Sequence, residues 1–172
     1  MSNTGFSEER LLQNKHAARD MWRRIKDNVL FHETTEIRQL EALVKKYKPD
    51  IVVVDQMDKL NINGSFARDD LKLSEIYRRG REIAKKNQCS VIAVTQADAS
   101  ADGRTSLRFT QMSGSKIGKP AEADYVLGLG KESTENGSDN FLRYLTVSKN
   151  KIGGKHGRCI ITIQPEVSRY RD

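Results

Sequence analysis

A chain of 172 residues, of which 37% are hydrophobic and 31% charged, is long enough for one globular domain, and its valine and isoleucine runs exclude disorder throughout. No apolar run approaches the roughly 18 residues of a membrane span, and the polar N-terminus has no signal-peptide pattern, so we expect a cytoplasmic protein without a membrane partner. Thirty Lys and Arg against 23 Asp and Glu give a formal net charge of +7, which favours nucleic acid or nucleotide as partner over a merely solvated surface.

The beginning of the chain predicts a helical segment that is separate from the rest. Apolar residues recur at near-helical intervals between residues 7 and 28, which is the pattern of an amphipathic helix or a helical pair. Val29, Leu30 and Phe31 then form a short strand candidate. We therefore divide the chain into an N-terminal helical segment, residues 1–28, and a core, residues 29–172.

The first half of the core predicts alternating helices and strands. A helix that a threonine can cap and Pro49 ends is followed by the β-branched run 51–54, the pattern of a strand covered on both faces in a parallel sheet. A long helix up to residue 87 has a basic outer face that we interpret as solvated surface. The next apolar run, residues 90–95, predicts a second buried strand.

The second half of the core predicts one further strand and a hairpin. A long polar loop, residues 97–120, is followed by strand character at 125–129 and an exposed turn at 131–140. Two last strands, about 142–148 and 158–163, suggest a hairpin. We therefore predict an α/β fold whose sheet is mostly parallel and ends in an antiparallel C-terminal hairpin.

Asp55 and Gln96 directly follow the two predicted buried strands. Ligands of such sheets bind beyond the carboxyl ends of the strands, so both are candidates for a functional site. A carboxylate after an apolar strand is the Walker B arrangement, which holds Mg²⁺ beside nucleotide phosphates, and a glutamine there can orient water or sense a terminal phosphate. The alternatives are a turn or cap role for Asp55 and a local backbone contact for Gln96.

The segment 148–155 is strongly basic. No acidic residue occurs between Asp139 and Glu166, and such a density of positive charge suits a polyphosphate or a nucleic-acid backbone. The alternative is the solvated tip of a hairpin.

An ordered series of short segments runs through the chain: residues 28–32 with the helix that follows, 51–55, the helix up to 87, 91–96, 122–127 and 149–151. In order and spacing this series resembles the DnaB-type replicative DNA helicases, phage-related ones in particular, over about residues 28–165. The resemblance implies the RecA-like ATPase fold of P-loop NTPases, with ATP and Mg²⁺ as ligands. It also implies like subunits assembled in a hexameric ring around single-stranded DNA.

The resemblance also implies roles for particular residues. Asp55 would be the Walker B carboxylate for Mg²⁺ and Gln96 the sensor that couples nucleotide state to DNA-binding loops. Lys149 and Lys151 match a Lys-x-Arg pair that reaches the γ-phosphate of a neighbouring subunit. Lysine at position 151 keeps the charge but lacks the planar fork of arginine.

The polar loop 97–120 lies where the family has channel loops that contact single-stranded DNA. We expect phosphate contacts from four basic residues of this loop: Arg104, Arg108, Lys116 and Lys119. The alternative is an exposed loop that binds nothing.

The sequence contains no G-x-x-x-x-G-K-[ST] phosphate-binding loop. In residues 114–120 only three residues separate the two glycines, and Pro120 stands where the metal-binding hydroxyl belongs. The family has this loop before the region that the chain resembles, so we expect a sheet that is incomplete on its N-terminal side. An expressed fragment, a split helicase whose other polypeptide carries the P-loop, and a degenerate RecA-like binding protein all remain open.

We therefore expect part of a ring-shaped helicase that couples ATP hydrolysis to translocation on single-stranded DNA and to duplex unwinding. Because the P-loop is absent, we expect no ATP hydrolysis by this chain alone. Two alternatives remain: a RecA-like or RadA-like recombination ATPase, and a non-catalytic RecA-like module for DNA binding or assembly.

Overall fold

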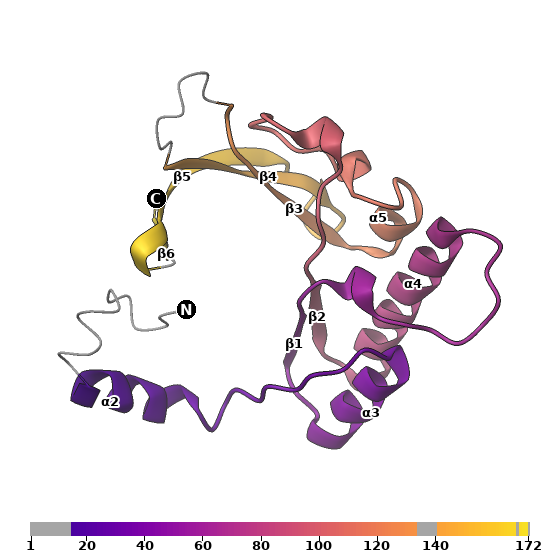
Figure 1. Ribbon diagram of the computed structural model, residues 1–172, viewed down its shortest axis with the longest axis horizontal. Coiled ribbons are helices and arrows are strands. Elements are labelled where there is room, and N and C mark those ends of the chain that lie inside the picture. The colour runs from indigo at the N-terminus through magenta and orange to yellow at the C-terminus, as the bar shows by residue number, and fades with distance from the viewer. Residues whose placement is uncertain (1–14, 134–140, 168, 172) are drawn as a thin grey trace.

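The computed structural model describes residues 15–133, 141–167 and 169–171. It begins with helix α2 (Lys15–Ile25), which lies apart from the remaining elements at the end of an extended segment (Figure 1). The predicted strand at residues 29–31 does not form, and Phe31 is 75% exposed. Residues 1–14 of the predicted N-terminal segment and residues 134–140 of the predicted turn lie outside the described residues.

Two helices and two strands build the first part of the core. Helix α3 (Ile37–Tyr47) leads into strand β1 (Ile51–Val54), and helix α4 (Asp69–Asn87) leads into strand β2 (Ser90–Ala93). The strands pair in parallel with Ile51 opposite Ser90 and Val54 opposite Ala93. The predicted alternation of helix and strand is confirmed for these four elements.

The apolar spacing of these elements explains their packing. Ile37, Leu40 and Val44 recur every three or four residues and are buried along one side of α3. In α4 the buried residues are Ile76, Tyr77, Gly80 and Ile83. Both helices pack against the same side of the sheet, where alternate residues of the strands, Val52, Val54, Val91 and Ala93, complete the hydrophobic core.

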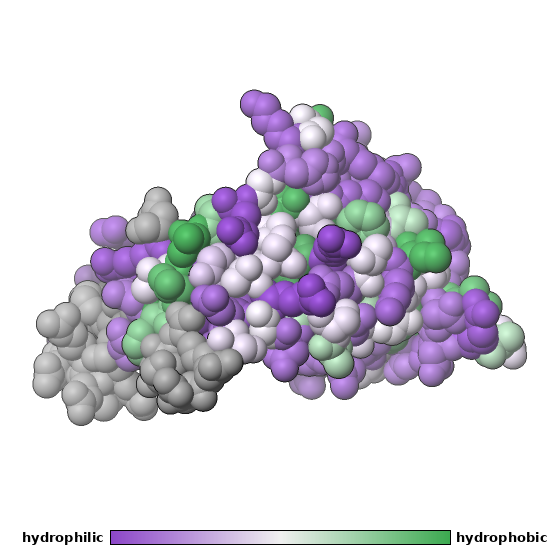
Figure 2. Space-filling view, turned by 90° about the horizontal axis from the view of Figure 1, so that it is seen from above, coloured by the Kyte–Doolittle hydropathy of each residue, from purple (hydrophilic) through white to green (hydrophobic). Residues whose placement is uncertain are grey.

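The other side of the parallel sheet is uncovered within the described part of the chain. Ile51 and Val53 of β1 are 59% and 65% exposed, and Ile92 of β2 is 50% exposed. The prediction that these strands are covered on both faces is therefore wrong for the described residues, because α3 and α4 lie on one face only (Figure 1). In the view of Figure 2, hydrophobic patches lie among the hydrophilic residues that cover most of the surface.

The last third of the chain forms a separate antiparallel sheet. After the short helix α5 (Gly118–Glu122) come β3 (Tyr125–Gly130), β4 (Leu142–Asn150), β5 (Gly157–Gln164) and β6 (Arg169–Arg171), which pair in chain order. The predicted C-terminal hairpin is confirmed by the antiparallel β4–β5 pair. A mostly parallel sheet is not found among the described strands, because β3 pairs with β4 rather than with β2. None of the helices in the described ranges is long and apolar enough to cross a membrane.

Replacing a residue of the hydrophobic core should lower the free energy of unfolding far more than replacing one on the uncovered face. Ile76 is fully buried, so we expect Ile76→Ala to lower the free energy of unfolding by about 2–5 kcal/mol, measured by urea denaturation and circular dichroism. Val53→Thr keeps a β-branched residue in the strand and should change it by less than about 0.5 kcal/mol. An equal loss of unfolding free energy in Ile76→Ala and Val53→Thr would contradict the packing of the helices on one face only.

Candidate functional site

Asp55 and Gln96 lie at the same edge of the parallel sheet. The Val94 backbone N–H donates to the Val54 carbonyl oxygen at 3.0 Å, so the residues that follow β1 and β2 remain side by side. Gln56 has a left-handed backbone with φ of 52°, which turns the chain away from the strand directly after Asp55. The structure thus brings together the two residues that the sequence predicted for this edge.

Both side chains are available to a ligand. Asp55 and Gln96 are exposed, and among the described residues neither side chain has a hydrogen-bond or ion-pair partner. The described part of the chain contains no group of three or more His, Cys, Asp or Glu residues that could hold a metal alone. A single carboxylate fits Mg²⁺, which commonly takes one or two carboxylates and completes its coordination with water and phosphate oxygens.

Lys149 and Lys151 lie at a different place, beside the C-terminus of α5. The Lys149 ammonium donates to the Pro120 carbonyl oxygen, and the Lys151 ammonium donates to that of Ala121 at 3.2 Å. The last carbonyl groups of a helix lack partners within it and attract cations. Burial lowers the pKa of Lys149, and the neighbouring charge of Lys151 lowers it further. No contact among the described residues joins either lysine to Asp55 or Gln96.

Arg81 of α4 lies beside Lys149 and Lys151, and we call these three residues the basic cluster. Sequence reasoning did not predict that Arg81 belongs to it. Its guanidinium donates to the Glu122 carbonyl oxygen at 2.7 Å and lies 3.1 Å from the Asp124 carboxylate. The same carboxylate lies 3.7 Å from the Lys151 ammonium. The sequence placed Arg81 on the solvated face of its helix, and nothing in the local pattern distinguishes it from its basic neighbours.

The segment between β2 and α5 is an ordered loop, which we call the basic loop (residues 97–117). Its base is closed by two backbone hydrogen bonds, from Asp98 N–H to Gln111 O at 2.8 Å and from Ser113 N–H to Gln96 O at 3.0 Å. Two turns of 3-10 helix lie within it, Ala99–Ala101 and Phe109–Gln111.

The tip of the basic loop packs on the antiparallel sheet, where β3 has glycines. A Cβ at Gly128 would lie 2.7 Å from the Leu107 Cβ, and one at Gly130 would lie 2.9 Å from the Thr105 carbonyl oxygen. Arg104 and Arg108 flank this contact and are exposed. The structure therefore presents both predicted DNA-contact arginines to solvent on a supported loop.

The other two lysines predicted to contact DNA have different positions. Lys116 is exposed and lies 3.8 Å from the Asp98 carboxylate. Lys119 is buried, with a side chain that is 0% exposed and an ammonium 2.7 Å from Asp58 Oδ2. The structure contradicts the prediction for Lys119, because a buried ammonium paired with a carboxylate presents no charge to a DNA backbone. Sequence reasoning missed Asp58, whose signal is a charged residue in the turn that follows Asp55.

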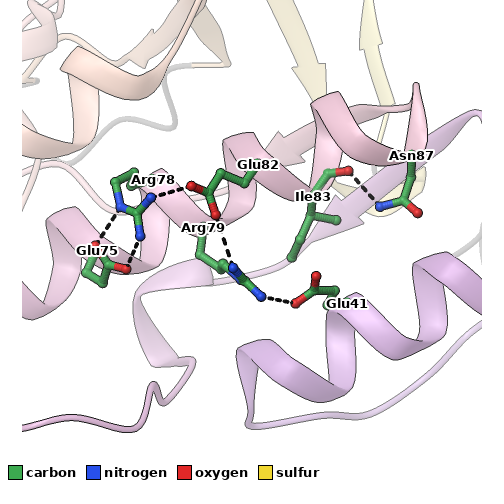
Figure 3. A network of polar contacts seen from close by, with 7 residues as sticks. All are labelled: Glu41, Glu75, Arg78, Arg79, Glu82, Ile83 and Asn87. Carbon is green, nitrogen blue, oxygen red and sulfur yellow. Dashed lines mark hydrogen bonds and ion pairs between the residues drawn. The ribbon is translucent and has the colours of Figure 1, made fainter.

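Two arginines on the basic outer face of α4 are paired with glutamates (Figure 3). Arg78 pairs with Glu75 and Glu82, while Arg79 pairs with Glu82 and, 2.5 Å away, with Glu41 of α3. The hydrogen bond from Arg78 lowers the pKa of Glu75, so this carboxylate stays ionised. The Arg79–Glu41 pair joins α3 to α4, and Arg78 and Arg79 offer little uncompensated charge to nucleic acid, whereas Lys85 and Lys86 at the end of α4 are exposed.

The fold is shared with a DnaB-like replicative helicase and with a solved ATPase domain, which confirms at the level of fold the resemblance seen in the sequence. A solved structure described as an ATPase domain superposes with a TM-score of 0.80 at 14% identity, over 98% of this chain. A DnaB-like replicative helicase, described together with its interactions with primase, gives a TM-score of 0.77 at 14% identity over 92% of this chain. These neighbours support a RecA-like α/β fold.

The chain spans only part of these two proteins, namely 66% of the solved ATPase domain and 41% of the DnaB-like helicase chain. No family profile and no curated protein matches the sequence.

Filling the glycine contact under the basic loop should displace its tip. In Gly130→Ala the new Cβ would meet the backbone of residues 104 and 105, which cannot move aside as a flexible side chain can. We expect hydrogen exchange at the Arg104 and Arg108 amides to accelerate by about tenfold or more. Gly157→Ala, where a Cβ would meet no atom within 4 Å, is the matched control. Unchanged exchange in Gly130→Ala would contradict the packing of the loop on β3.

Proposed function

We propose that this chain provides the part of a ring-shaped replicative helicase that holds the Walker B carboxylate and the DNA-binding loop. The observation that carries the proposal is the exposed pair Asp55 and Gln96, placed at the carboxyl edge of a fold shared with helicase ATPase domains. In the complete protein, ATP hydrolysis would drive movement along single-stranded DNA and separation of the duplex.

At the nucleotide, Asp55 would hold Mg²⁺ and Gln96 would contact the terminal phosphate or the attacking water. Bound Mg²⁺ would neutralise charge on the phosphate oxygens. Gln96 can serve either purpose because its amide both donates and accepts hydrogen bonds. Its position directly before the basic loop supports the proposed link between nucleotide state and DNA contact.

The lysine pair would act on the nucleotide of a neighbouring subunit. Lys149 and Lys151 are separate from Asp55 and Gln96 and gather with Arg81 in one basic cluster, which supports a role in trans. Asp124 would orient Lys151 within this cluster. Since lysine offers a point charge rather than a bidentate fork, we expect weaker orientation of the phosphate than an arginine would give.

Arg104, Arg108 and Lys116 would contact phosphates of single-stranded DNA from the basic loop. All three are exposed, and the packing on β3 holds the loop in one position. A preorganised set of cations loses less freedom on binding than a flexible loop.

A phosphate-binding segment would cover the open side of the parallel sheet. Parallel strands are almost always covered on both faces, yet Val53 is 65% exposed and Ile92 is 50% exposed. This chain spans 66% of the solved ATPase domain, so the remainder of that domain is large enough to supply such a cover. We therefore propose that polypeptide bearing a P-loop, in the same protein or in a separate one, packs on this face and cradles the phosphates.

ATP turnover tests the nucleotide site. The chain alone should not hydrolyse ATP with Mg²⁺, because its sequence contains no G-x-x-x-x-G-K-[ST] phosphate-binding loop. Mixed with a polypeptide that carries the P-loop part of a DnaB-like helicase ATPase, it should hydrolyse ATP faster when single-stranded DNA is added. Asp55→Asn should lower this turnover by about 100-fold or more, because the metal carboxylate is lost.

Asp50→Asn is the matched control for that experiment, because Asp50 is an exposed carboxylate at the opposite end of β1. It should leave turnover unchanged. Turnover that survives Asp55→Asn would contradict the assigned role. Salt-sensitive DNA binding that no nucleotide changes, even with the P-loop polypeptide present, would instead favour a non-catalytic binding module.

Salt dependence tests the proposed DNA contacts. We expect Arg104→Ala/Arg108→Ala to weaken binding of a labelled single-stranded oligonucleotide and to reduce the slope of log K against log salt by roughly 1.4, or about 0.7 for each phosphate contact. Fluorescence anisotropy over a salt series measures both. Arg38→Ala/Lys45→Ala removes the same charge from the exposed side of α3 and should leave the slope unchanged. If the two double variants had equal slopes, the result would contradict the proposal that the basic loop contacts DNA.

A further inference from the structure

Lys119 is a buried lysine with a complete set of acceptors. Its ammonium donates to Asp58 Oδ2 at 2.7 Å, to Thr95 Oγ1 at 3.2 Å and to the Ser113 carbonyl oxygen. An ammonium has three protons, so each has a partner. Such saturation is what makes a buried charge tolerable, because an unpaired charge away from water is very costly.

Asp58 is equally well satisfied. The Tyr77 hydroxyl donates to Asp58 Oδ1 at 2.8 Å, and the Thr95 hydroxyl donates to Oδ2 at 2.6 Å. The Tyr77 ring also lies 5.5 Å from the Lys119 ammonium, within the range of a cation–π contact. The result is a closed network of four side chains from four separate segments of the chain.

This network connects the nucleotide edge with the basic loop. Asp58 lies three residues after Asp55, in the short 3-10 helix Met57–Lys59, and Thr95 directly precedes Gln96. Lys119 comes from α5, beyond the far end of the loop. Ser113, whose carbonyl oxygen binds Lys119, also donates its N–H to the Gln96 carbonyl oxygen at 3.0 Å.

We propose that Lys119 is a positioning residue that fixes the base of the basic loop to the ends of β1 and β2. Arg104 and Arg108 are thereby held in register with Asp55 and Gln96, and a shift at either end is passed to the other through the Asp58–Lys119 ion pair. What the two ends bind rests on the proposed function, whereas the attachment of the loop does not.

The Asp58–Lys119 ion pair serves to orient the loop rather than to add to the stability of the fold. Replacing a buried ion pair by apolar residues of similar size is often neutral for stability, but apolar side chains do not fix an orientation as hydrogen bonds do. Lys119→Met alone leaves Asp58 without its counter-ion and can weaken the whole fold. The double variant Asp58→Leu/Lys119→Met removes both charges together, so no unpaired charge remains; it also removes the acceptor of the Tyr77 and Thr95 hydroxyls, and exchange elsewhere in the fold measures any loss of global stability.

The test is hydrogen exchange measured residue by residue on the full chain. In both variants we expect the Asp98 and Ser113 amides, which close the base of the loop, to exchange about tenfold faster or more. In the double variant, the amides of α3 and of the β4–β5 pair should stay as protected as in the wild type. Lys59→Met removes the same charge from an exposed position beside Asp58 and should change neither set.

Two outcomes would overturn the proposal. One is unchanged exchange at Asp98 and Ser113 in the double variant. The other is faster exchange by the same factor throughout α3, β4 and β5, because a loss of global stability would then explain the change at the loop.

DNA binding separates this proposal from the proposed function. If the loop binds single-stranded DNA, Asp58→Leu/Lys119→Met should weaken binding, and the same change made in Arg104→Ala/Arg108→Ala should weaken it little further. Full additivity would overturn the coupling. If the wild-type chain binds no single-stranded DNA, the proposed function is wrong. The hydrogen-exchange result would still show whether Lys119 attaches the loop.

Discussion

The packing of α3 and α4 against one side of the β1–β2 pair is the constraint on which the rest of the structure depends. Ile37, Ile76 and Ile83 are almost fully buried there together with alternate strand residues, and this burial fixes the parallel register of the two strands. The register in turn sets Asp55 and Gln96 side by side at one edge. The hydrophobic core therefore positions the candidate site, although none of its side chains contributes to the chemistry.

The same one-sided packing leaves apolar strand residues exposed on the other side, and this connects fold to function. Among the described residues one face of the parallel sheet is open, and the proposed nucleotide site has no phosphate-binding loop in this sequence, so the proposed cover of that face and the proposed phosphate-binding segment would be one piece of polypeptide. The basic loop is attached at two places. Its base is held by the Lys119–Asp58 ion pair, and its tip packs against the glycines of β3 in the antiparallel sheet. A loop held at both places would carry a displacement from the edge with Asp55 and Gln96 to the loop arginines, as the proposed function requires.

The sequence predicted the elements whose pattern is strong and local. The run Ile51–Val54 and the periodic helix up to Asn87 were found where predicted, and the polar residues that end the strands lie at one edge because parallel strands require it. Long-range partners could not be predicted. Lys119 looked like a surface lysine in a polar loop, but it is buried because Asp58, 61 residues away in the chain, supplies its counter-charge. The strand expected at residues 29–31 failed for a related reason, since no described strand lies beside it to supply hydrogen bonds.

The central claim is that Asp55 and Gln96 form the metal and phosphate edge of a nucleotide site. Paramagnetic broadening of backbone amide signals by Mn²⁺–ATP, recorded by nuclear magnetic resonance on the isotope-labelled chain, tests this claim most directly because it detects even weak binding. We expect the signals of residues 55, 56, 96 and 97 to broaden at the lowest Mn²⁺–ATP concentrations, and Asp55→Asn to abolish the effect. Broadening that begins elsewhere, or that persists unchanged in Asp55→Asn, would contradict the assignment of this edge to the nucleotide.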